Sequence, residues 1–383
     1  MELETTANAS FVAFDGGVQQ LSGEDTALIL PFVLGAICAL GIGGNALLLA
    51  VLARSARDTG VSDTVALLAS VSAADLMLLT LCAPVRALTY RERAWTLGPV
   101  ACRTSEWLQH GCLAAKAFTL LLLSRARHDL HSRVTSDARS ALTKRTLMSA
   151  CGAWTTALAF PVADIAFSNL RVKGNVSLCV SEAPAHAQEL VRTYGKVLPV
   201  VAYAVPVVLA AVCHARAVFK SVPRAREASA ARRGQIALSL LAVTAANSLA
   251  LLPEWGAWAW ARAHHGGGGA REGCGPPAAV FVFAHVCTYL ASAFSPAMLL
   301  STLVPLRDSL TRACIRVSFS GRRTTTDVKA QRGSTASDIL AAEAYGRTLP
   351  ELEHFWSGRQ NTTMPDNSDP FPWERMEPGC AEL

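Results

Sequence analysis

Seven hydrophobic runs separated by polar connections dominate the chain. Polar stripes are mostly absent inside them, and each is about the 20 residues that a helix needs to cross a membrane. The runs cover residues 27–52, 65–85, 104–124, 147–167, 197–219, 236–261 and 278–304. The pattern predicts an all-α membrane protein with a seven-transmembrane helix bundle over residues 27–304. No inverted repeat typical of transporters is visible.

The polar parts of the chain lie at its two ends. Residues 1–26 are acidic and lack Lys and Arg, so we expect an extracellular disordered N-terminus without a cleavable signal peptide. Residues 305–317 space apolar side chains at helical intervals between basic ones, which predicts a short amphipathic eighth helix on the membrane surface. Cys314 in that helix is a candidate for palmitoylation, the alternative being a free thiol. Residues 318–383 are predicted to form a disordered cytoplasmic tail, whose aromatic end suggests a docking motif for a cytoplasmic protein.

Charge sets the predicted orientation of the bundle. With 383 residues, 51% of them hydrophobic and 17% charged, the chain is too apolar for a soluble protein. Its net charge of +6 comes mainly from Lys and Arg in alternate connections and after the seventh run. Positive residues stay on the cytoplasmic side, so the N-terminus is predicted outside and the C-terminus inside. Attraction to anionic lipid explains this excess better than nucleic-acid binding does.

The connections predicted outside carry possible modification sites. Asn8 and Asn175 each begin an Asn-x-Ser sequon and are candidate glycosylation sites. Cys102, Cys179 and Cys274 also lie outside, where an oxidising environment favours a Cys102–Cys179 disulfide. Cys274 then has no obvious mate.

Two charged residues lie near the middle of the predicted membrane helices, far from water on either side. Asp75 lies about a dozen residues from the inner end of the second run, and Lys116 lies roughly 21 Å below Cys102 along the third. An ionised side chain is costly at that depth unless it is paired. We therefore expect an internal Asp75–Lys116 salt bridge, with Asn45, Ser292 and Ser295 as hydrogen-bond partners. The alternative is that Lys116 extends toward lipid, although both surfaces are far away.

Polar and aromatic side chains gather in the outer halves of the runs, within about three turns of the surface. They suggest a mixed-charge ligand vestibule that suits a peptide better than a lipid, although packing explains any one of them equally well. Trp255 and Trp258 fit an interfacial aromatic belt as well. His110 and His285 lie near Glu106 and Glu254, so protons are a second candidate signal, because histidine changes charge between about pH 5 and pH 8. The vestibule residues are Arg86, Tyr90, Glu106, Gln109, His110, Glu254, Trp255, Trp258, His285 and Tyr289.

Landmarks over about residues 1–317 resemble those of rhodopsin-like (class A) G-protein-coupled receptors. They are Gly44-Asn45, Ala74-Asp75-Leu76, Trp95 with the Cys102/Cys179 pair, Arg127, Trp154, Pro206, Pro253 and Pro296. The resemblance implies a plasma-membrane receptor that couples to heterotrimeric G proteins. Arg127 and His128 would then belong to the G-protein docking surface. In the family the aspartate matching Asp75 binds sodium, which the ammonium group of Lys116 would replace here.

A narrower resemblance is to the orphan, galanin-receptor-like, habenula-enriched branch of this family. It is carried by APVRALTY (83–90), CRTSEWLQHGCLAAKAFT (102–119), LLPEWGAWAW (251–260), EHFW (353–356) and DNSDPFPWE (366–374). It implies a neuronal, presynaptic or axonal receptor with an unidentified ligand, and favours coupling to Gi/Go.

The chain departs from the family pattern at its switch residues. The usual Asp-Arg-Tyr is Ala126-Arg127-His128, and the usual sixth-helix tryptophan is Leu251. The seventh-helix motif reads Ser295-Pro296-Ala297-Met298-Leu299 and lacks its tyrosine, while His214 takes the fifth-helix tyrosine position. These departures put the coupling of ligand to G protein in doubt, but not the fold.

Three classes of function remain. The leading hypothesis is a receptor that transmits a signal by helix rearrangement, without catalysis, metal or cofactor. The alternative is a weakly signalling receptor-fold protein that acts as a presynaptic scaffold or trafficking partner through its tail. A transporter or channel would need a continuous polar path, which one buried aspartate and one buried lysine do not provide.

Overall fold

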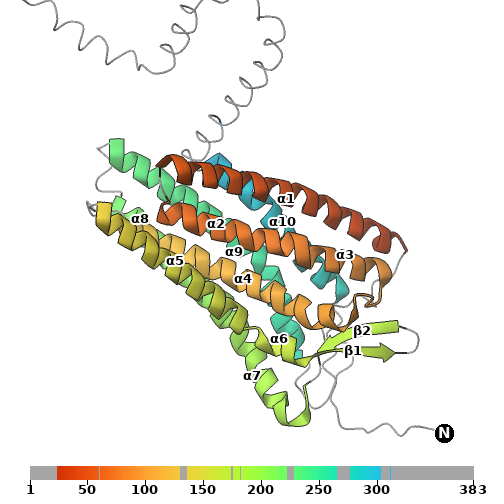
Figure 1. The fold of residues 1–383 in the computed structure, drawn as a ribbon. Helices are drawn as coiled ribbons and strands as arrows, with labels where there is room; N and C mark the ends of the chain where they lie inside the picture. Colours follow the sequence, from red (N-terminus) through yellow and green to blue (C-terminus); the bar gives the residue numbers. More distant parts are fainter. Residues whose placement is uncertain are drawn as a thin grey trace, which may run out of the picture. The chain divides into compact units, whose positions relative to one another are not determined.

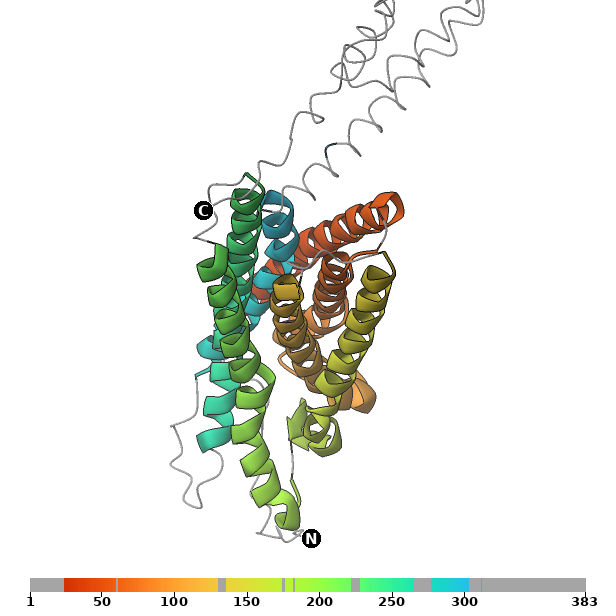
Figure 2. The ribbon, with the colours of Figure 1, turned by 90° about the vertical axis from the view of Figure 1, so that its left-hand side faces the viewer.

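The computed structural model describes residues 24–59, 61–129, 136–173, 176–181, 183–221, 228–264, 277–302 and 311. Asn8, Asn175, Cys274 and Cys314 lie outside these residues, as do most of the predicted N-terminal segment, the eighth helix and the tail. The structure therefore does not test the predictions made for them. The described part is a bundle of long helices that run side by side (Figures 1 and 2).

Each hydrophobic run forms helix. The long helices are α1 (Glu24–Thr59), α2 (Asp63–Met77), α3 (Ala83–Glu92), α4 (Gly98–Asp129), α5 (Ser136–Ala159), α7 (Gln188–Pro199), α8 (Val205–Ser221), α9 (Ala228–His264) and α10 (Ala278–Thr302). Because π-helical turns η2 (Leu78–Cys82) and η4 (Val200–Ala204) join α2 to α3 and α7 to α8, the bundle has seven helical passes. Six described stretches are long and apolar enough to span a membrane. The seventh is α4, whose charges, among them Glu106 and Lys116, lower its hydropathy.

Prolines explain the two π-helical turns. Pro84 follows η2 and Pro206 follows η4. A proline ring clashes with the carbonyl four residues earlier, here Thr80 or Ala202, each of which lies inside its π-helical turn. The wider turn accommodates that clash without ending the helix. Both passes through the bundle therefore continue as helix beyond their prolines.

Helix α4 has the most partners in the bundle. It packs against α2, α5, α8 and α9, so its polar side chains can meet those of most other passes. At the edge, α1 packs against α2, α3 and α10. A Cβ atom added to Gly41 in α1 would lie 2.6 Å from Leu79 Cδ1 and 2.9 Å from Ala293 Cα. Glycine is thus what lets these helices approach so closely.

A β-hairpin closes one end of the bundle (Figure 1). Strands β1 (Ser168–Lys173) and β2 (Val176–Ser181) follow the short helix α6 (Val162–Phe167) and pair antiparallel, with Leu170 opposite Cys179. The 3₁₀ turn η3 (Ala185–Ala187) then leads into α7. The predicted Cys102–Cys179 disulfide is confirmed, with a Cα–Cα distance of 5.5 Å. We call this end the outer end, since disulfides form in oxidising compartments.

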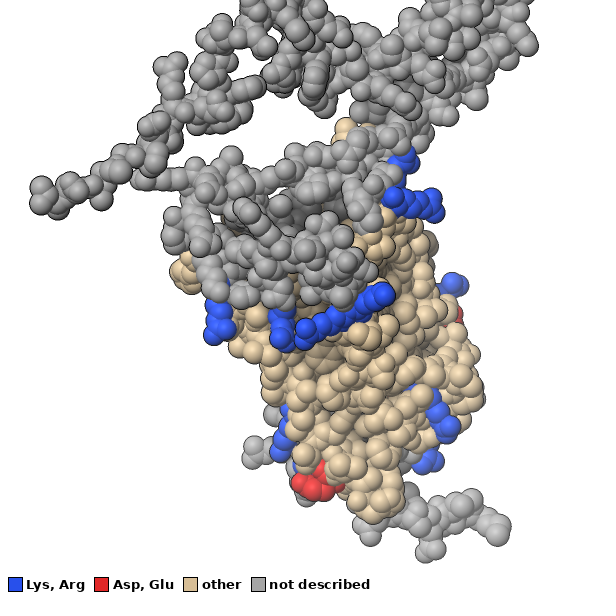
Figure 3. Space-filling model, turned by 60° about the vertical axis from the view of Figure 1, so that its left-hand side comes forward, with Lys and Arg blue, Asp and Glu red and all other residues tan. Residues whose placement is uncertain are grey.

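The middle of the bundle presents apolar side chains outward. Phe32 and Leu40 of α1 are 73% and 74% exposed. In a soluble protein such exposure would favour aggregation, whereas in a membrane it is the surface that contacts lipid. Figure 3 shows the same feature as a band without charged side chains between two ends that carry them.

Candidate functional site

Asp75 and Lys116 lie together in the middle of the bundle. Lys116 Nζ donates a hydrogen bond to Asp75 Oδ1 at 2.6 Å, and both side chains are fully buried. The hydroxyl groups of Ser292 and Ser295 lie beside the same carboxylate. Neither hydroxyl forms a hydrogen bond of normal geometry, and Asp75 Oδ2 lacks a hydrogen-bond partner as well. The expected pair is thus present, and Lys116 does not extend toward lipid.

Asn45 has a different role from the one predicted. Its Nδ2 donates to the carbonyl oxygens of Gly41 at 2.9 Å and Ser292 at 3.0 Å, and its Oδ1 accepts from Ser72 Oγ at 3.0 Å. These bonds tie α1 to α2 and α10. They leave no bond from Asn45 to the Asp75–Lys116 pair in the described structure, so the prediction that it supports the pair directly was wrong.

Five of the ten predicted vestibule residues form a closed, buried network rather than an open cavity. Tyr90 Oη lies 2.6 Å from His285 Nδ1, and His285 Nε2 lies 3.5 Å from Glu254 Oε1. Gln109 Nε2 donates to the same Glu254 oxygen at 2.6 Å, and Gln109 Oε1 accepts from Tyr289 Oη at 2.9 Å. All five residues are at most 5% exposed. They join α3, α4, α9 and α10 to one another, and a ligand reaches them only if the helices move.

A second set of charges lies nearer the outer end. The guanidinium of Arg86 on α3 forms a salt bridge with Glu106 Oε1 on α4. Glu106 Oε2 is 4.0 Å from His110 Nδ1, and the same nitrogen is 2.9 Å from Asp164 Oδ2 on α6. Asp164 was not among the residues predicted from the sequence. Its position three residues before the end of the hydrophobic run 147–167, among apolar neighbours, was the available signal.

Two tryptophans of α9 face the interior of the bundle. Trp255 and Trp258 are each 2% exposed, and the ring centroid of each lies 5.5 Å from that of His110. Trp255 also stacks on Tyr203 of η4, with ring centroids 6.2 Å apart. An interfacial belt would leave both rings exposed to lipid, so that interpretation is wrong. The two rings instead connect His110 to α9.

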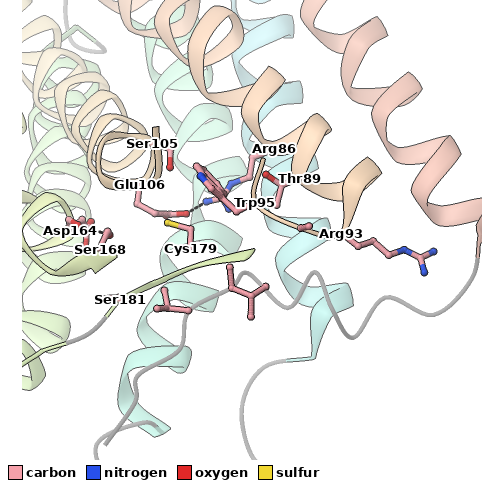
Figure 4. Close-up of a pocket in the computed structure, with 13 residues that line it drawn as sticks. Arg86, Thr89, Arg93, Trp95, Ser105, Glu106, Asp164, Ser168, Cys179 and Ser181 are labelled. Atoms are coloured by element: carbon pink, nitrogen blue, oxygen red, sulfur yellow. Dashed lines mark hydrogen bonds and ion pairs between the residues drawn. The ribbon is translucent and has the colours of Figure 1, made fainter. Parts of the chain in front are cut away.

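One recess opens next to the outer charges, beneath the hairpin (Figure 4). Arg86 and Glu106 form part of its wall, together with Trp95, Ser105, Cys179 and Ser181. Figure 4 shows Arg86 and Glu106 pointing toward each other, whereas Arg93 points away. The cavity volume is about 30 Å³, which holds one or two water molecules. Among the described residues, no three His, Cys, Asp or Glu side chains are grouped so as to hold a metal ion.

The altered switch positions lie at the inner end and, for Leu251, in the middle of the bundle. Arg127 and His128 lie in the last turn of α4, and their side chains are not among those that the structure describes. Leu251 and Leu299 are each 1% exposed and pack into the apolar core. His214 Nε2 lies 3.2 Å from Thr244 Oγ1, which joins α8 to α9. Apolar packing and one histidine therefore occupy the positions where tyrosine and tryptophan are usual in the family that the sequence resembles.

The bundle, its outer disulfide and its buried polar centre define a seven-helix membrane protein. Residues 44–299 match the 7 transmembrane receptor (rhodopsin family), and the chain belongs to that family. Its members are receptors rather than enzymes.

Individual receptors of the family are similar to this chain, two of them over nearly its whole length. The chain is 27% identical to the "G-protein coupled receptor 151 protein" of Mus musculus, over 96% of this chain and 93% of the relative. It is also 27% identical to "G-protein coupled receptor 151" of Homo sapiens, over 99% and 97%. "Galanin receptor type 2" of Homo sapiens is 27% identical over 60% of this chain and 59% of the relative. The predicted likeness to orphan and galanin receptors is thus confirmed.

Proposed function

We propose that this chain transmits an extracellular signal to heterotrimeric G proteins of the Gi/Go class. The observation that carries the proposal is the buried network of Tyr90, Gln109, Glu254, His285 and Tyr289, in a chain of the rhodopsin family. Because it joins four helices below the recess, an event at the outer end that moves one helix disturbs the packing of the others. The galanin receptors among the relatives favour a peptide-like ligand and Gi/Go. The expected location is the neuronal plasma membrane, including axons and presynaptic terminals.

Nucleotide exchange tests this function directly. We would incubate the purified protein, reconstituted in lipid, with Gi, Go, Gs, Gq and G12 heterotrimers and measure GTP-analogue uptake. The proposal expects uptake by Gi and Go above that with empty vesicles. Absence of exchange with every heterotrimer would favour the alternative, a presynaptic scaffold or trafficking partner. The buried leucines Leu251 and Leu299 at switch positions are what support that alternative.

Protons are a second candidate signal. His110 faces Glu106 and Asp164, while His285 faces Glu254 and the hydroxyl of Tyr90. A protonated histidine would turn each contact with a carboxylate into a salt bridge and so alter the outer network. The test is G-protein activation between about pH 7.5 and pH 5.5 in the wild type and a His110→Gln/His285→Gln double variant. Identical pH profiles would remove protons as the signal.

A further inference from the structure

The Arg86–Glu106 salt bridge lies where the outer network meets the recess. The Arg86 and Glu106 side chains are 8% and 16% exposed, and both line the recess. Farther in, Gln109, Trp255 and Tyr289 are at most 2% exposed. A molecule that enters the recess therefore contacts this ion pair before it reaches the rest of the network.

Among the described side chains, those of the outer end carry more positive than negative charge. Arg103 and Arg171 are exposed there, Arg91 is exposed and paired with Glu92, and Arg93 is half-buried at the recess. The exposed acids of that end, among the side chains that the structure describes, are Glu92 and Glu189, each already paired with an arginine. An excess of positive charge around an opening raises the local concentration of anions and their rate of entry. Arg86 is the cation that such an anion meets inside the recess.

We propose that the extracellular ligand carries an anionic group, such as a carboxylate, that displaces Glu106 from Arg86. This deepens the function proposed above and rests on it. A carboxylate matches the planar guanidinium as well as Glu106 does, so the exchange costs Arg86 no hydrogen bond. The released Glu106 carboxylate then turns to His110, whose Nδ1 is already 4.0 Å away on the same helix.

His110 is the positioning residue through which this exchange reaches α9. Its ring packs against both Trp255 and Trp258, and its Nδ1 contacts Asp164 at 2.9 Å. A new contact with Glu106 competes with Asp164 for that nitrogen and shifts the ring against the two tryptophans. Trp255 lies two residues beyond Pro253, where α9 lacks one backbone hydrogen bond and bends more easily. An ion-pair exchange at the recess thus becomes a movement of α9.

Binding is tested without any G protein. The probes are phenylacetate and phenylacetamide, which differ in charge but hardly in size, added to the purified receptor at equal ionic strength. Phenylacetate should raise the melting temperature and phenylacetamide should not, because only an anion binds Arg86 in the folded state. Glu106→Gln removes the carboxylate that competes for Arg86. It should lower the phenylacetate concentration needed to raise the melting temperature by about tenfold. Arg86→Gln should abolish the effect, and Glu92→Gln, which removes an exposed acid of the same end, should leave it unchanged.

Signalling separates recognition from transmission. Arg86→Gln frees Glu106 for His110, so it should raise basal nucleotide exchange several-fold, whereas Glu106→Gln should bind the anion and not raise exchange. His110→Phe, which keeps an aromatic ring against both tryptophans, should cancel the rise caused by Arg86→Gln. Arg86→Lys keeps the positive charge and is the control for misfolding of Arg86→Gln. It should still bind phenylacetate, but more weakly than the wild type. If Arg86, Glu106 and His110 had only a structural role, all of these variants would lose phenylacetate binding and nucleotide exchange alike.

The two proposals fail in different ways. Melting temperatures that do not distinguish phenylacetate from phenylacetamide, or wild type from Arg86→Gln, overturn the anion site whatever the exchange assays give. Exchange that occurs but is unaffected by Arg86→Gln and His110→Phe overturns the route to α9. Anion binding with the expected variant pattern, but without exchange on any heterotrimer, leaves the site in place and overturns the signalling function.

Discussion

The ion pair between Asp75 and Lys116 is the residue-scale feature with the largest expected energetic effect. Both side chains are fully buried, with Lys116 Nζ 2.6 Å from Asp75 Oδ1. If one charge is removed, water cannot solvate the other. Lys116→Met or Asp75→Asn alone should each destabilise the protein by about 3–5 kcal/mol. The double variant should recover most of that loss, because it leaves no buried charge. Thermal unfolding in detergent micelles gives the stability of the wild type, the two single variants and the double variant. If the stability lost in the double variant equalled the sum of the two single losses, the pairing would be contradicted.

The same pair predicts how the protein responds to sodium. In the family that the sequence resembles, the aspartate at the position of Asp75 binds a sodium ion. Here the Lys116 ammonium already neutralises that carboxylate, so exchanging sodium for choline should leave the melting temperature unchanged. Lys116→Ser restores a small polar residue and should make stability depend on sodium. A sodium effect of equal size in the wild type would show that the ammonium does not replace the ion.

The pairing of Asp75 with Lys116 could be predicted because depth along two membrane helices is simple arithmetic. Burial at the outer end could not be predicted in this way. Gln109, Glu254 and His285 are polar and near the outer surface, which suggests a vestibule, but their contacts with each other close it. Asp164 was missed because its approach to His110 depends on how α6 follows α5, which no local pattern encodes.

Close helix packing gives the prediction at the scale of elements. A methyl group at Gly41 would overlap Leu79 and Ala293, whereas one at Gly43, also in α1, would meet nothing within 4 Å. Gly41→Ala should therefore lower the melting temperature by several degrees, since overpacking costs about 1–3 kcal/mol. Gly43→Ala is the matched control and should be neutral or slightly stabilising, because alanine favours helix. Equal melting temperatures for the two variants would mean that α1 is not held as closely as the structure indicates.

The length of the hydrophobic runs predicted the helices well and the irregular elements poorly. A run of about 20 apolar residues has one stable form in lipid, so its helix follows directly from the sequence. The hairpin β1–β2 depends instead on tertiary contacts: the Cys102–Cys179 disulfide and the 2.7 Å hydrogen bond from the Trp95 amide to the Ser177 carbonyl. The two π-helical turns were likewise unpredicted, although the prolines that follow them were visible.

For the whole molecule, the decisive question is how the inner end controls signalling. The basic connections predicted inside, together with Arg127 at the end of α4, form the expected G-protein docking surface. The residue before Arg127 is Ala126, so the arginine lacks the adjacent acid that restrains it in related receptors. We expect measurable basal nucleotide exchange in the absence of ligand.

Two variants of α4 test this expectation in opposite directions. Arg127→Ala should lower basal and ligand-stimulated exchange together, because it removes the cation that engages the G protein. Ala126→Asp supplies the missing acid and should lower basal exchange by severalfold while leaving ligand-stimulated exchange in place, since an adjacent carboxylate favours the restrained state. Arg125→Ala removes a neighbouring exposed cation and serves as the control. With exchange rates normalised to folded receptor, an Arg127→Ala protein as active as Arg125→Ala would show that α4 does not use this arginine for docking.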